Sequence, residues 1–220
     1  MISPAAVQLF SGLQQNEIKA IEAAAIRRQF EASQIIVRAS EPGECLFLVR
    51  TGCVDYYVTT EAGEDVLLRR LTPGEVFGMN CFLSRPIGYL GTAKAVRQTG
   101  VLEWKHLTVM QLSKTYPRLV ENALRIALRY LALYAKRHIG LVSDTAQERL
   151  ACALSSLGSR TGHAVSSGVE VGIKNEDLAS LADVSYFTAS RVLRGWAREG
   201  VVEKRRGTIV IKSPERLLAA

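Results

Sequence analysis

The chain has 220 residues, 48% of them hydrophobic and 22% charged, so it is long enough to bury one large core or two smaller ones. No apolar run reaches the roughly 18 to 20 residues that cross a bilayer, and the start Met1-Ile2-Ser3-Pro4 lacks the pattern of a signal peptide. We therefore expect a cytoplasmic protein with no membrane partner.

The net charge of +7 is unevenly distributed along the chain. Basic and acidic residues balance within residues 1–112, whereas residues 113–143 carry a net charge of +5 and residues 144–220 a net charge of +2. Within the last part, residues 185–216 hold eight basic and three acidic side chains. Nucleic-acid phosphate is the polyanion that this half of the chain would attract, although two solvated helix faces would give the same charge.

The four cysteines form no CxxC pair, which argues against a zinc ribbon or an iron–sulfur cluster. We expect them to act as small buried hydrophobic residues. The alternative is a thiol-based redox switch, for which Cys45 and Cys53 are the best pair.

The N-terminal half changes from helical to strand periodicity. Residues 13–26 predict an amphipathic helix with Leu13, Ile18, Ile21 and Ala25 along one side. Turn dipeptides then recur with glycines nine, eleven and eleven residues apart, the spacing of antiparallel strands joined by tight turns. The predicted strands, which together form a small barrel or sandwich, are Gln34–Arg38, Cys45–Val49, Val54–Thr59, Val66–Leu71, Thr92–Val96 and Val101–Trp104.

A second helical period, about 25 residues long, follows Pro117. Its apolar positions recur at spacings of 4 and 3, a heptad-like seam that predicts a dimerisation helix; a core helix within a monomer is the alternative. Basic residues on another face are expected to stay in solvent without a ligand: Arg125, Arg129, Lys136 and Arg137. The seam consists of Leu124, Leu128, Leu131, Ala135, His138 and Val142.

A domain boundary is expected near residue 143, where Ser143-Asp144 breaks the long helix. Thr145 and Glu148 then form a capping box that opens the next helix. Gly158 is expected to close that helix, and the glycine- and serine-rich residues 158–168 to form a loop.

Residues 173–211 predict two short helices joined by a tight turn and followed by a β-hairpin. Asn175 is expected to cap the first helix, Asp183-Val184 to form the turn, and Ser185 to cap a second helix from Tyr186 to Arg198. Gly200 ends the second helix, and Val201–Glu203 and Thr208–Ile211 flank a basic tip. This order of elements is a winged helix-turn-helix, in which the second helix fits the major groove and the wing reaches phosphate.

The residues expected to contact double-stranded DNA lie on the second helix and at the wing tip. On the helix, the side that carries Ala189, Leu193 and Trp196 is expected to pack inward. The opposite side and the wing supply the predicted contacts, which are Ser185, Tyr186, Phe187, Thr188, Ser190, Arg191, Arg194, Lys204, Arg205 and Arg206.

The whole chain resembles the cAMP receptor protein/fumarate–nitrate regulator family over about residues 9–212. The resemblance is carried by LFSGLQQNEIKAIEAAA, by EPGECLFLVRTGCVDYYVTTEAGEDVLLRRLTPGEVFG and by ADVSYFTASRVLRGWAREGVV. It implies an α+β fold with an N-terminal antiparallel β-roll like the cyclic-nucleotide-binding domain (1–112), a long dimerisation helix (113–143) and a C-terminal winged helix-turn-helix (144–220). It also implies a non-enzymatic, homodimeric regulator that binds promoters, often in contact with RNA polymerase.

The recognition helix matches the family pattern only in part. Ser185, Thr188 and Arg191 stand where many members have Ser, Thr and Arg, whereas Tyr186 and Phe187 replace two base-reading positions. Arg191 can still make a bidentate contact to guanine, and the two hydroxyl residues suit phosphate or capping. Phe187 could contact only a thymine methyl group or a base edge. The alternative is that it packs into the domain core.

The effector region departs further from the members that bind cyclic AMP. Gly78 matches, but Met79 replaces the ribose-binding Glu, and Tyr89 and Leu90 stand where an Arg-Ser pair would hold the cyclic phosphate. A buried phosphate without such partners is poorly neutralised, so we expect cyclic AMP not to be the ligand. The region holds either an unidentified small molecule or its own side chains. The residues concerned are Gly78, Met79, Asn80, Tyr89, Leu90, Thr92 and Tyr134.

No other cofactor is expected from the sequence. An iron–sulfur sensor would need N-terminal cysteines, and none precedes Cys45. A haem ligand would have to be a lone histidine such as His106 or His138, and neither these nor His163 form a metal-binding cluster. The resulting expectation is a homodimer on a palindromic site, either gated by movement near residues 140–145 or active without any ligand.

Overall fold

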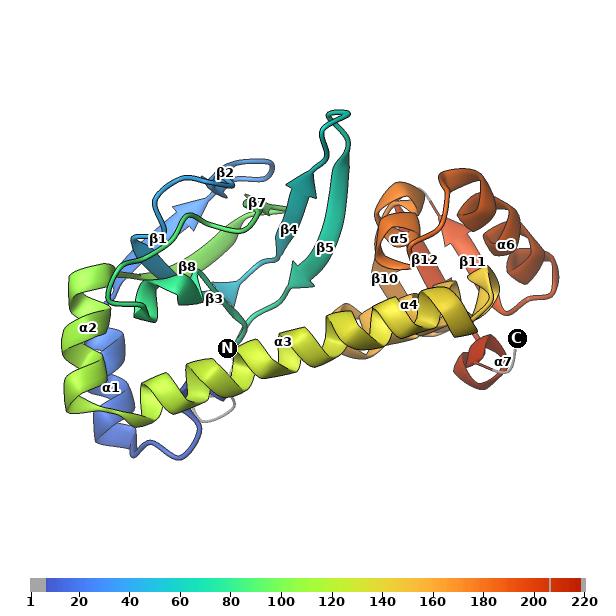
Figure 1. The fold of residues 1–220 in the computed structure, drawn as a ribbon. Helices are drawn as coiled ribbons and strands as arrows, with labels where there is room; N and C mark the ends of the chain where they lie inside the picture. The colour runs from blue at the N-terminus through green and yellow to red at the C-terminus, as the bar shows by residue number, and fades with distance from the viewer. Residues whose placement is uncertain (1–6, 206, 219–220) are drawn as a thin grey trace. The chain divides into compact units, whose positions relative to one another are not determined.

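The computed structural model describes residues 7–205 and 207–218, and the chain divides into two compact units, Met1–Leu133 and Tyr134–Ala220 (Figure 1). The long helix α3 (Arg118–Ser143) contributes residues to both units. Its observed bounds confirm the helix that the sequence predicts after Pro117. Within the described residues, no helix combines the length and the apolar character needed to cross a membrane.

The first unit contains two four-stranded antiparallel sheets, which confirms the predicted β-roll. One sheet has the order β1 (Ile26–Phe30), β8 (Thr99–Lys105), β3 (Cys45–Thr51) and β6 (Val76–Phe77). The other has the order β2 (Ile35–Val37), β7 (Thr92–Ala95), β4 (Val54–Thr59) and β5 (Asp65–Leu71). All six predicted strands are present: Val54–Thr59 has the predicted bounds, and no end of the other five is shifted by more than two residues.

Two strands and part of a helix differ from the sequence-based expectation. Helix α1 (Gln15–Ala23) ends before Ile26, which the sequence placed in the helix and which instead begins β1. The β1 sequence IRRQF lacks alternation because four of its five residues are exposed, and its strand form depends on pairing with β8. Strand β6 has two residues and is too short to give a periodic signal.

The β-roll core consists of residues from both sheets and the covering helices. Trp104 is buried beneath α1 and donates its indole N–H to the Ile21 carbonyl oxygen over 2.7 Å. The rings of Phe47 and Phe77 stack at 4.8 Å on paired strands. Helices α1 and α2 (His106–Thr115) and the 3-10 helices η2 (Gln8–Phe10) and η3 (Met79–Phe82) complete this part of the chain.

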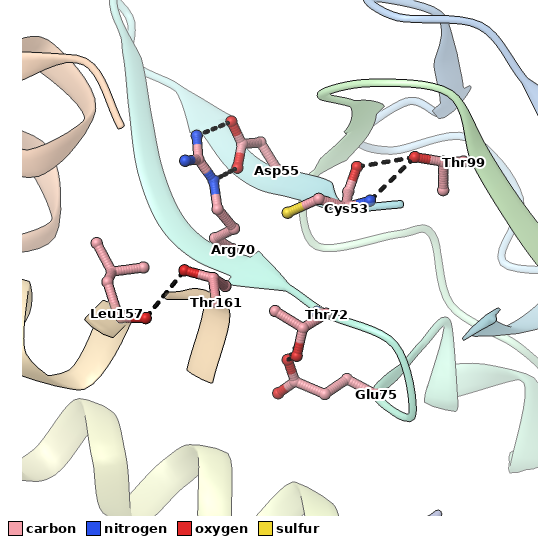
Figure 2. A network of polar contacts seen from close by, with 8 residues as sticks. All are labelled: Cys53, Asp55, Arg70, Thr72, Glu75, Thr99, Leu157 and Thr161. Atoms are coloured by element: carbon pink, nitrogen blue, oxygen red, sulfur yellow. Dashed lines mark hydrogen bonds and ion pairs between the residues drawn. The ribbon is translucent and has the colours of Figure 1, made fainter. Parts of the chain in front are cut away.

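A buried ion pair links the β4 and β5 strands of the second sheet. Arg70 and Asp55 lie directly opposite each other, with Nε–Oδ1 at 2.7 Å and Nη2–Oδ2 at 2.8 Å (Figure 2). Nearby, the Thr99 hydroxyl bridges the backbone N–H and carbonyl of Cys53. Both arrangements satisfy polar groups that burial would otherwise leave costly.

The structure argues against the alternative of a thiol switch between Cys45 and Cys53. Cys45 begins the seven-residue strand β3 and Cys53 follows its end. At about 3.3 Å per residue the two lie on the order of 20 Å apart, whereas a disulfide needs Cα atoms within about 7 Å. Sequence spacing suggested proximity, but an extended strand separates the two thiols.

The second unit packs around one apolar core. It comprises the last turns of α3, α4 (Ala146–Thr161), a sheet of order β11-β12-β10-β9, and the helices α5 (Asn175–Leu181), α6 (Tyr186–Arg198) and α7 (Pro214–Leu218). The core includes Leu150, Leu154, Leu193 and Trp196. The strands are β9 (His163–Val165), β10 (Gly168–Gly172), β11 (Val202–Arg205) and β12 (Thr208–Ile211).

The start of α4 confirms the predicted capping box, but its end does not follow the prediction. The Thr145 hydroxyl accepts from the Glu148 N–H at 3.2 Å, and the Glu148 carboxylate accepts from the Thr145 N–H at 2.6 Å. The helix continues past Gly158 to Thr161, and Gly158 instead provides close packing, because a Cβ there would lie 2.9 Å from Ile211. The expected loop 158–168 contains β9, so the wing belongs to a four-stranded sheet.

Candidate nucleic-acid interface

Helices α5 and α6 form the predicted helix-turn-helix. Ala189, Leu193 and Trp196 are all at most 1% exposed and fix the inner side of α6 against the core. The N-cap of α5 is Lys174, and Asn175 is its first helical residue, so the predicted Asn175 cap is wrong. Lys174 has extended backbone, and its side chain makes no capping hydrogen bond to this helix. The packed inner side leaves the opposite side of α6 for recognition.

Two arginines, one from α3 and one from α4, contact the turn between α5 and α6. Asp183 adopts a left-handed φ of +51°, and Arg137 contacts its carboxylate through Nε–Oδ2 at 3.1 Å and Nη2–Oδ1 at 2.8 Å. Arg149 donates to the carbonyl oxygens of Ala182 at 3.1 Å and Asp144 at 2.7 Å. Arg137 is therefore not the solvated residue that the sequence predicted, because a carboxylate 46 residues away pairs with it.

These contacts also bear on the hinge expected near residues 140–145. Arg149 donates to the carbonyl oxygens of both Gly140 and Asp144 and to those of the helix-turn-helix turn. The last turns of α3, the start of α4 and the turn at Asp183 are thus joined by charge-assisted hydrogen bonds. The expected gating near residues 140–145 did not take account of this network, because Arg137 and Arg149 lie 46 and 33 residues from the groups that they contact in the turn.

The first turn of α6 is capped by its own hydroxyls. The Ser185 Oγ accepts from the Thr188 N–H at 3.1 Å and lies 2.9 Å from the Thr188 Oγ1. This is the arrangement expected of an N-cap serine. Of the two roles predicted for Ser185 and Thr188, phosphate contact and helix capping, the structure shows capping.

The outward side of α6 combines aromatic and basic side chains. Phe187 is 80% exposed and Tyr186 46% exposed, so the alternative in which Phe187 packs into the core is wrong. Their rings meet edge to face, with centroids 5.8 Å apart and planes at 77°. Arg191 and Arg194 are exposed on the same helix, and Arg194 Nε donates to the carbonyl oxygen of the half-buried Ser190.

The wing presents fewer unneutralised cations than its sequence suggests. Arg205 Nη1 lies 3.1 Å from Glu170, and its Nε lies 2.9 Å from Glu203. Glu203 also pairs with Lys212 at 3.0 Å, and these partners lower the pKa of its carboxyl. Lys204 is exposed, and Arg206 lies outside the described residues.

The residues expected at the effector region make contacts among themselves and with the β-roll backbone. The Tyr89 hydroxyl donates to the Cys45 carbonyl oxygen at 3.2 Å and accepts from the Cys45 N–H at 3.1 Å. Burial raises the pKa of this phenol. Gly78 has φ +79°, and a Cβ there would lie 2.3 Å from the same carbonyl. Leu90 is 75% exposed.

The other expected effector residues are similarly engaged. Asn80 Nδ2 donates to the Ile87 carbonyl oxygen at 2.5 Å, and Thr92 Oγ1 accepts from the Ala39 N–H at 3.1 Å. Met79 packs against the core of the first unit, whereas Tyr134 lies on α3 in the second unit. Of the two alternatives for this region, the one in which its own side chains fill it is the one that these contacts favour.

Within the first unit, a cation–π contact links strand β5 to helix α3. The Arg69 guanidinium lies 3.8 Å from the centroid of the Tyr130 ring and forms an ion pair with Glu75. The Tyr130 hydroxyl donates to the Val76 carbonyl oxygen at 3.3 Å. Sequence reasoning did not single out Arg69 or Tyr130, because they are 61 residues apart and belong to different elements. A guanidinium paired in this way is already neutralised.

Sequence reasoning also missed a cavity at the start of α3. The cavity has a volume of about 440 Å³ and lies between the N-terminal segment and α3. Asn122 closes one side by donating to the carbonyl oxygens of Leu9 and Ser11, both at 2.9 Å. The sequence carries one sign of this cavity: Arg118, Arg125 and Arg129 are spaced by 7 and 4 residues, which places them on one side of a helix. The lining residues are Val7, Gln8, Ser11, Gly12, Arg118, Glu121, Asn122, Arg125, Ile126 and Arg129.

The apolar seam of α3 is exposed in the single chain. Leu124, Leu128 and Leu131 are 58%, 55% and 64% exposed. At about 100° per residue they lie on a different side of α3 from Leu119 and Ile126, which are buried in the first unit. Ala135 and His138 are exposed as well, and Val142 is 86% exposed. A leucine seam of this kind marks an interface with another helix.

Comparison with known proteins agrees with both halves of this architecture. The family model for the cyclic nucleotide-binding domain matches residues 27–116, and that for the Crp-like helix-turn-helix domain matches residues 148–220. The cyclic AMP receptor protein of Thermus thermophilus is 31% identical over 205 residues, which cover 93% of this chain and 92% of that relative.

Solved structures share the fold. The c-di-GMP responsive global regulator CLP of Xanthomonas campestris matches with a TM-score of 0.77 at 20% identity, covering 90% of this chain and 99% of that one. FixK2 of Bradyrhizobium japonicum matches with a TM-score of 0.73 at 23% identity, covering 88% of this chain and 95% of that one. With its β-roll, its long helix and its winged helix-turn-helix, this chain belongs to the CRP/FNR family of transcription regulators.

Proposed function

We propose that this protein binds operator DNA as a homodimer and does so without cyclic AMP. The observation that carries the proposal is the outward side of α6, where Arg191, Arg194 and two aromatic rings are exposed on a helix whose inner side is fixed in a core. In a winged helix-turn-helix this side enters the major groove. Arg191 is the residue suited to a bidentate contact with guanine.

The exposed leucine seam of α3 supports the dimer. Leu124, Leu128 and Leu131 would lose their contact with water if the same residues of a second copy covered them. A two-fold axis along such a helix pair would relate the two α6 helices. Each would then reach one half of a palindromic site, with half-sites about one helical turn, ~34 Å, apart.

The effector region supports binding without cyclic AMP. The positions at which cyclic-AMP-binding members carry Arg-Ser hold Tyr89, bonded to the Cys45 backbone, and Leu90, exposed to solvent. Arg69, another arginine of the β-roll, is paired with Glu75 and stacked on Tyr130. A cyclic phosphate would therefore have to displace existing partners before it gained its own, which costs affinity.

Selection of bound sequences from a random duplex pool, with the purified protein and no added ligand, tests the proposal. We expect enrichment of a palindrome with half-sites about 10 base pairs apart. Titration of the selected duplex with and without cyclic AMP should then give the same affinity. Sequence-blind, salt-sensitive binding alone would overturn ligand-independent operator binding, and a tenfold or greater tightening by cyclic AMP would show that this effector acts after all.

A further inference from the structure

An exposed phenylalanine occupies the part of α6 that lies deepest in a DNA groove in winged helix-turn-helix proteins. Phe187 is the second residue of the helix, directly after the Ser185 cap and Tyr186, and its ring is 80% exposed. Single exposed apolar residues are common on protein surfaces. This one differs by its position, because the N-terminal residues of a recognition helix contact base edges.

The ring of Phe187 points to the same side of the helix as the predicted guanine reader. Residues 187, 191 and 194 are spaced by 4 and 3, so their side chains form one stripe along α6. Arg191 and Arg194 are both exposed on this stripe. Phe187 therefore shares its stripe with two cations, which would attract this side of α6 to a polyanion such as DNA.

Tyr186 restricts the orientation of this ring. The two aromatic rings meet edge to face at 5.8 Å and 77°, the geometry that aromatic pairs prefer. The helix beneath them is capped through Ser185 and Thr188 and packed through Ala189. The helix that carries Phe187 is therefore held in place, and the contact with Tyr186 favours one orientation of its ring.

A phenyl ring can read only one feature of the major groove. It carries no hydrogen-bond donor or acceptor, and the single apolar group on the major-groove edges of the four bases is the C5-methyl of thymine. We propose, on the basis of the operator binding proposed above, that Phe187 backed by Tyr186 selects a thymine in each half-site by contact with its C5-methyl group.

The distance between Phe187 and Arg191 predicts where that thymine lies. Four residues of helix correspond to about 6 Å along the axis, which is close to two base-pair steps of about 3.4 Å. If Arg191 reads a guanine, the thymine lies within about two base pairs of that guanine. The half-site would combine a hydrogen-bonded base and a methyl-bearing base in adjacent positions.

Substitution of single thymines by deoxyuridine in the selected operator tests the inference, because this change removes only the methyl group. We expect one position per half-site at which the wild-type protein binds about fourfold more weakly, the effect of losing one buried methyl group. Phe187→Ala should bind the thymine operator more weakly and show no difference between thymine and deoxyuridine at that position. Phe187→Leu, which keeps an apolar side chain, should retain part of the difference.

The controls separate this inference from the proposed function. Because Phe187 is exposed, Phe187→Ala should unfold at the same temperature as the wild type. A deoxyuridine scan without effect, or a methyl effect that persists in Phe187→Ala, would overturn methyl reading while leaving operator binding intact. Failure to select any operator would instead overturn the proposed function.

Discussion

Arg137 near the end of α3 and Asp183 in the turn of the helix-turn-helix form a bidentate ion pair, with Nη2–Oδ1 at 2.8 Å and Nε–Oδ2 at 3.1 Å. The same guanidinium donates to the Ser180 carbonyl oxygen at 3.1 Å. The pair is 21% and 31% exposed, so solvent screens it only in part. It joins the recognition turn to the long helix, and any movement that reorients α6 relative to these turns of α3 must break it.

Removal of this ion pair should destabilise the second unit. Arg137→Ala and Asp183→Asn should each lower the free energy of unfolding by about 1–2 kcal/mol, because each leaves a half-buried polar group with fewer partners. Asparagine tolerates the left-handed φ of residue 183, so Asp183→Asn isolates the loss of charge. Urea unfolding of the two single variants and the double variant gives the coupling energy, which should be about 1 kcal/mol.

A matched control lies on the same helix. Arg125 pairs with Glu121 at 2.7 Å, but the two side chains are 72% and 52% exposed. Arg125→Ala should therefore change the free energy of unfolding by less than about 0.5 kcal/mol. Equal losses for Arg125→Ala and Arg137→Ala would contradict a special role for the Asp183 contact.

Arg191→Ala should weaken binding to the selected operator by about 1–3 kcal/mol, because one bidentate contact to guanine is lost. Discrimination at the corresponding base pair should relax in the same variant. Arg27→Ala serves as the control, since Arg27 is exposed on β1 and its removal changes the net charge equally. Fluorescence anisotropy with the operator and its single-base variants measures both effects. Unchanged affinity in Arg191→Ala would place recognition on another surface.

Leu128→Glu should convert the proposed dimer to a monomer. Leu128 lies in the centre of the exposed seam, and a buried pair of carboxylates at this position would repel across a two-fold axis. Lys136→Gln, on another side of α3, lowers the net charge by the same amount and should leave the dimer intact. Sedimentation equilibrium reports the oligomeric state. A dimer that persists in Leu128→Glu would rule out the seam as the interface.

The thiols should differ sharply in reactivity. Burial raises the pKa of Cys53 from 9.0 to about 11 and that of Cys81 from 9.0 to about 12, and burial together with Glu103 raises that of Cys45 to about 11. Cys152 is exposed on α4. At pH 8 we expect iodoacetamide to modify Cys152 first, as judged by peptide mass spectrometry. Modification of Cys45 or Cys53 at the rate of Cys152 in the folded protein would contradict this assignment.

The same raised pKa values predict how the free energy of unfolding changes with pH. The folded state keeps these thiols protonated to higher pH than the unfolded chain does. Their contribution to stability is therefore complete below about pH 9 and is lost as the pH rises toward 11 to 12. Urea midpoints should fall between pH 8 and pH 10, and Cys81→Ala should reduce the slope of that fall.

The sequence predicted correctly those features that depend on residues close together in the chain. The capping box at Thr145 and Glu148 and the apolar positions of α6 depend on residues three or four apart, so the sequence displays them directly. Strand β1 and β9 escaped prediction because exposed or polar residues form them and only their partners, β8 and β10, make them strands. Of the residues predicted to contact DNA, Phe187, Arg191 and Arg194 are exposed on one side of α6, as their spacing of 4 and 3 indicates, whereas Asp183 and Arg137 meet through tertiary structure alone.

The carboxylates that surround Arg205 affect how the protein searches for its site. Glu170 and Glu203 pair with Arg205, and Glu203 also pairs with Lys212, so these four side chains balance in charge. Paired cations release fewer condensed counterions on meeting a random duplex than unpaired ones, so Arg205 should add little to sequence-independent binding. Replacing Glu170 with Gln would free one partner of Arg205, and we expect affinity for random duplex DNA, measured at low salt, to rise in that variant.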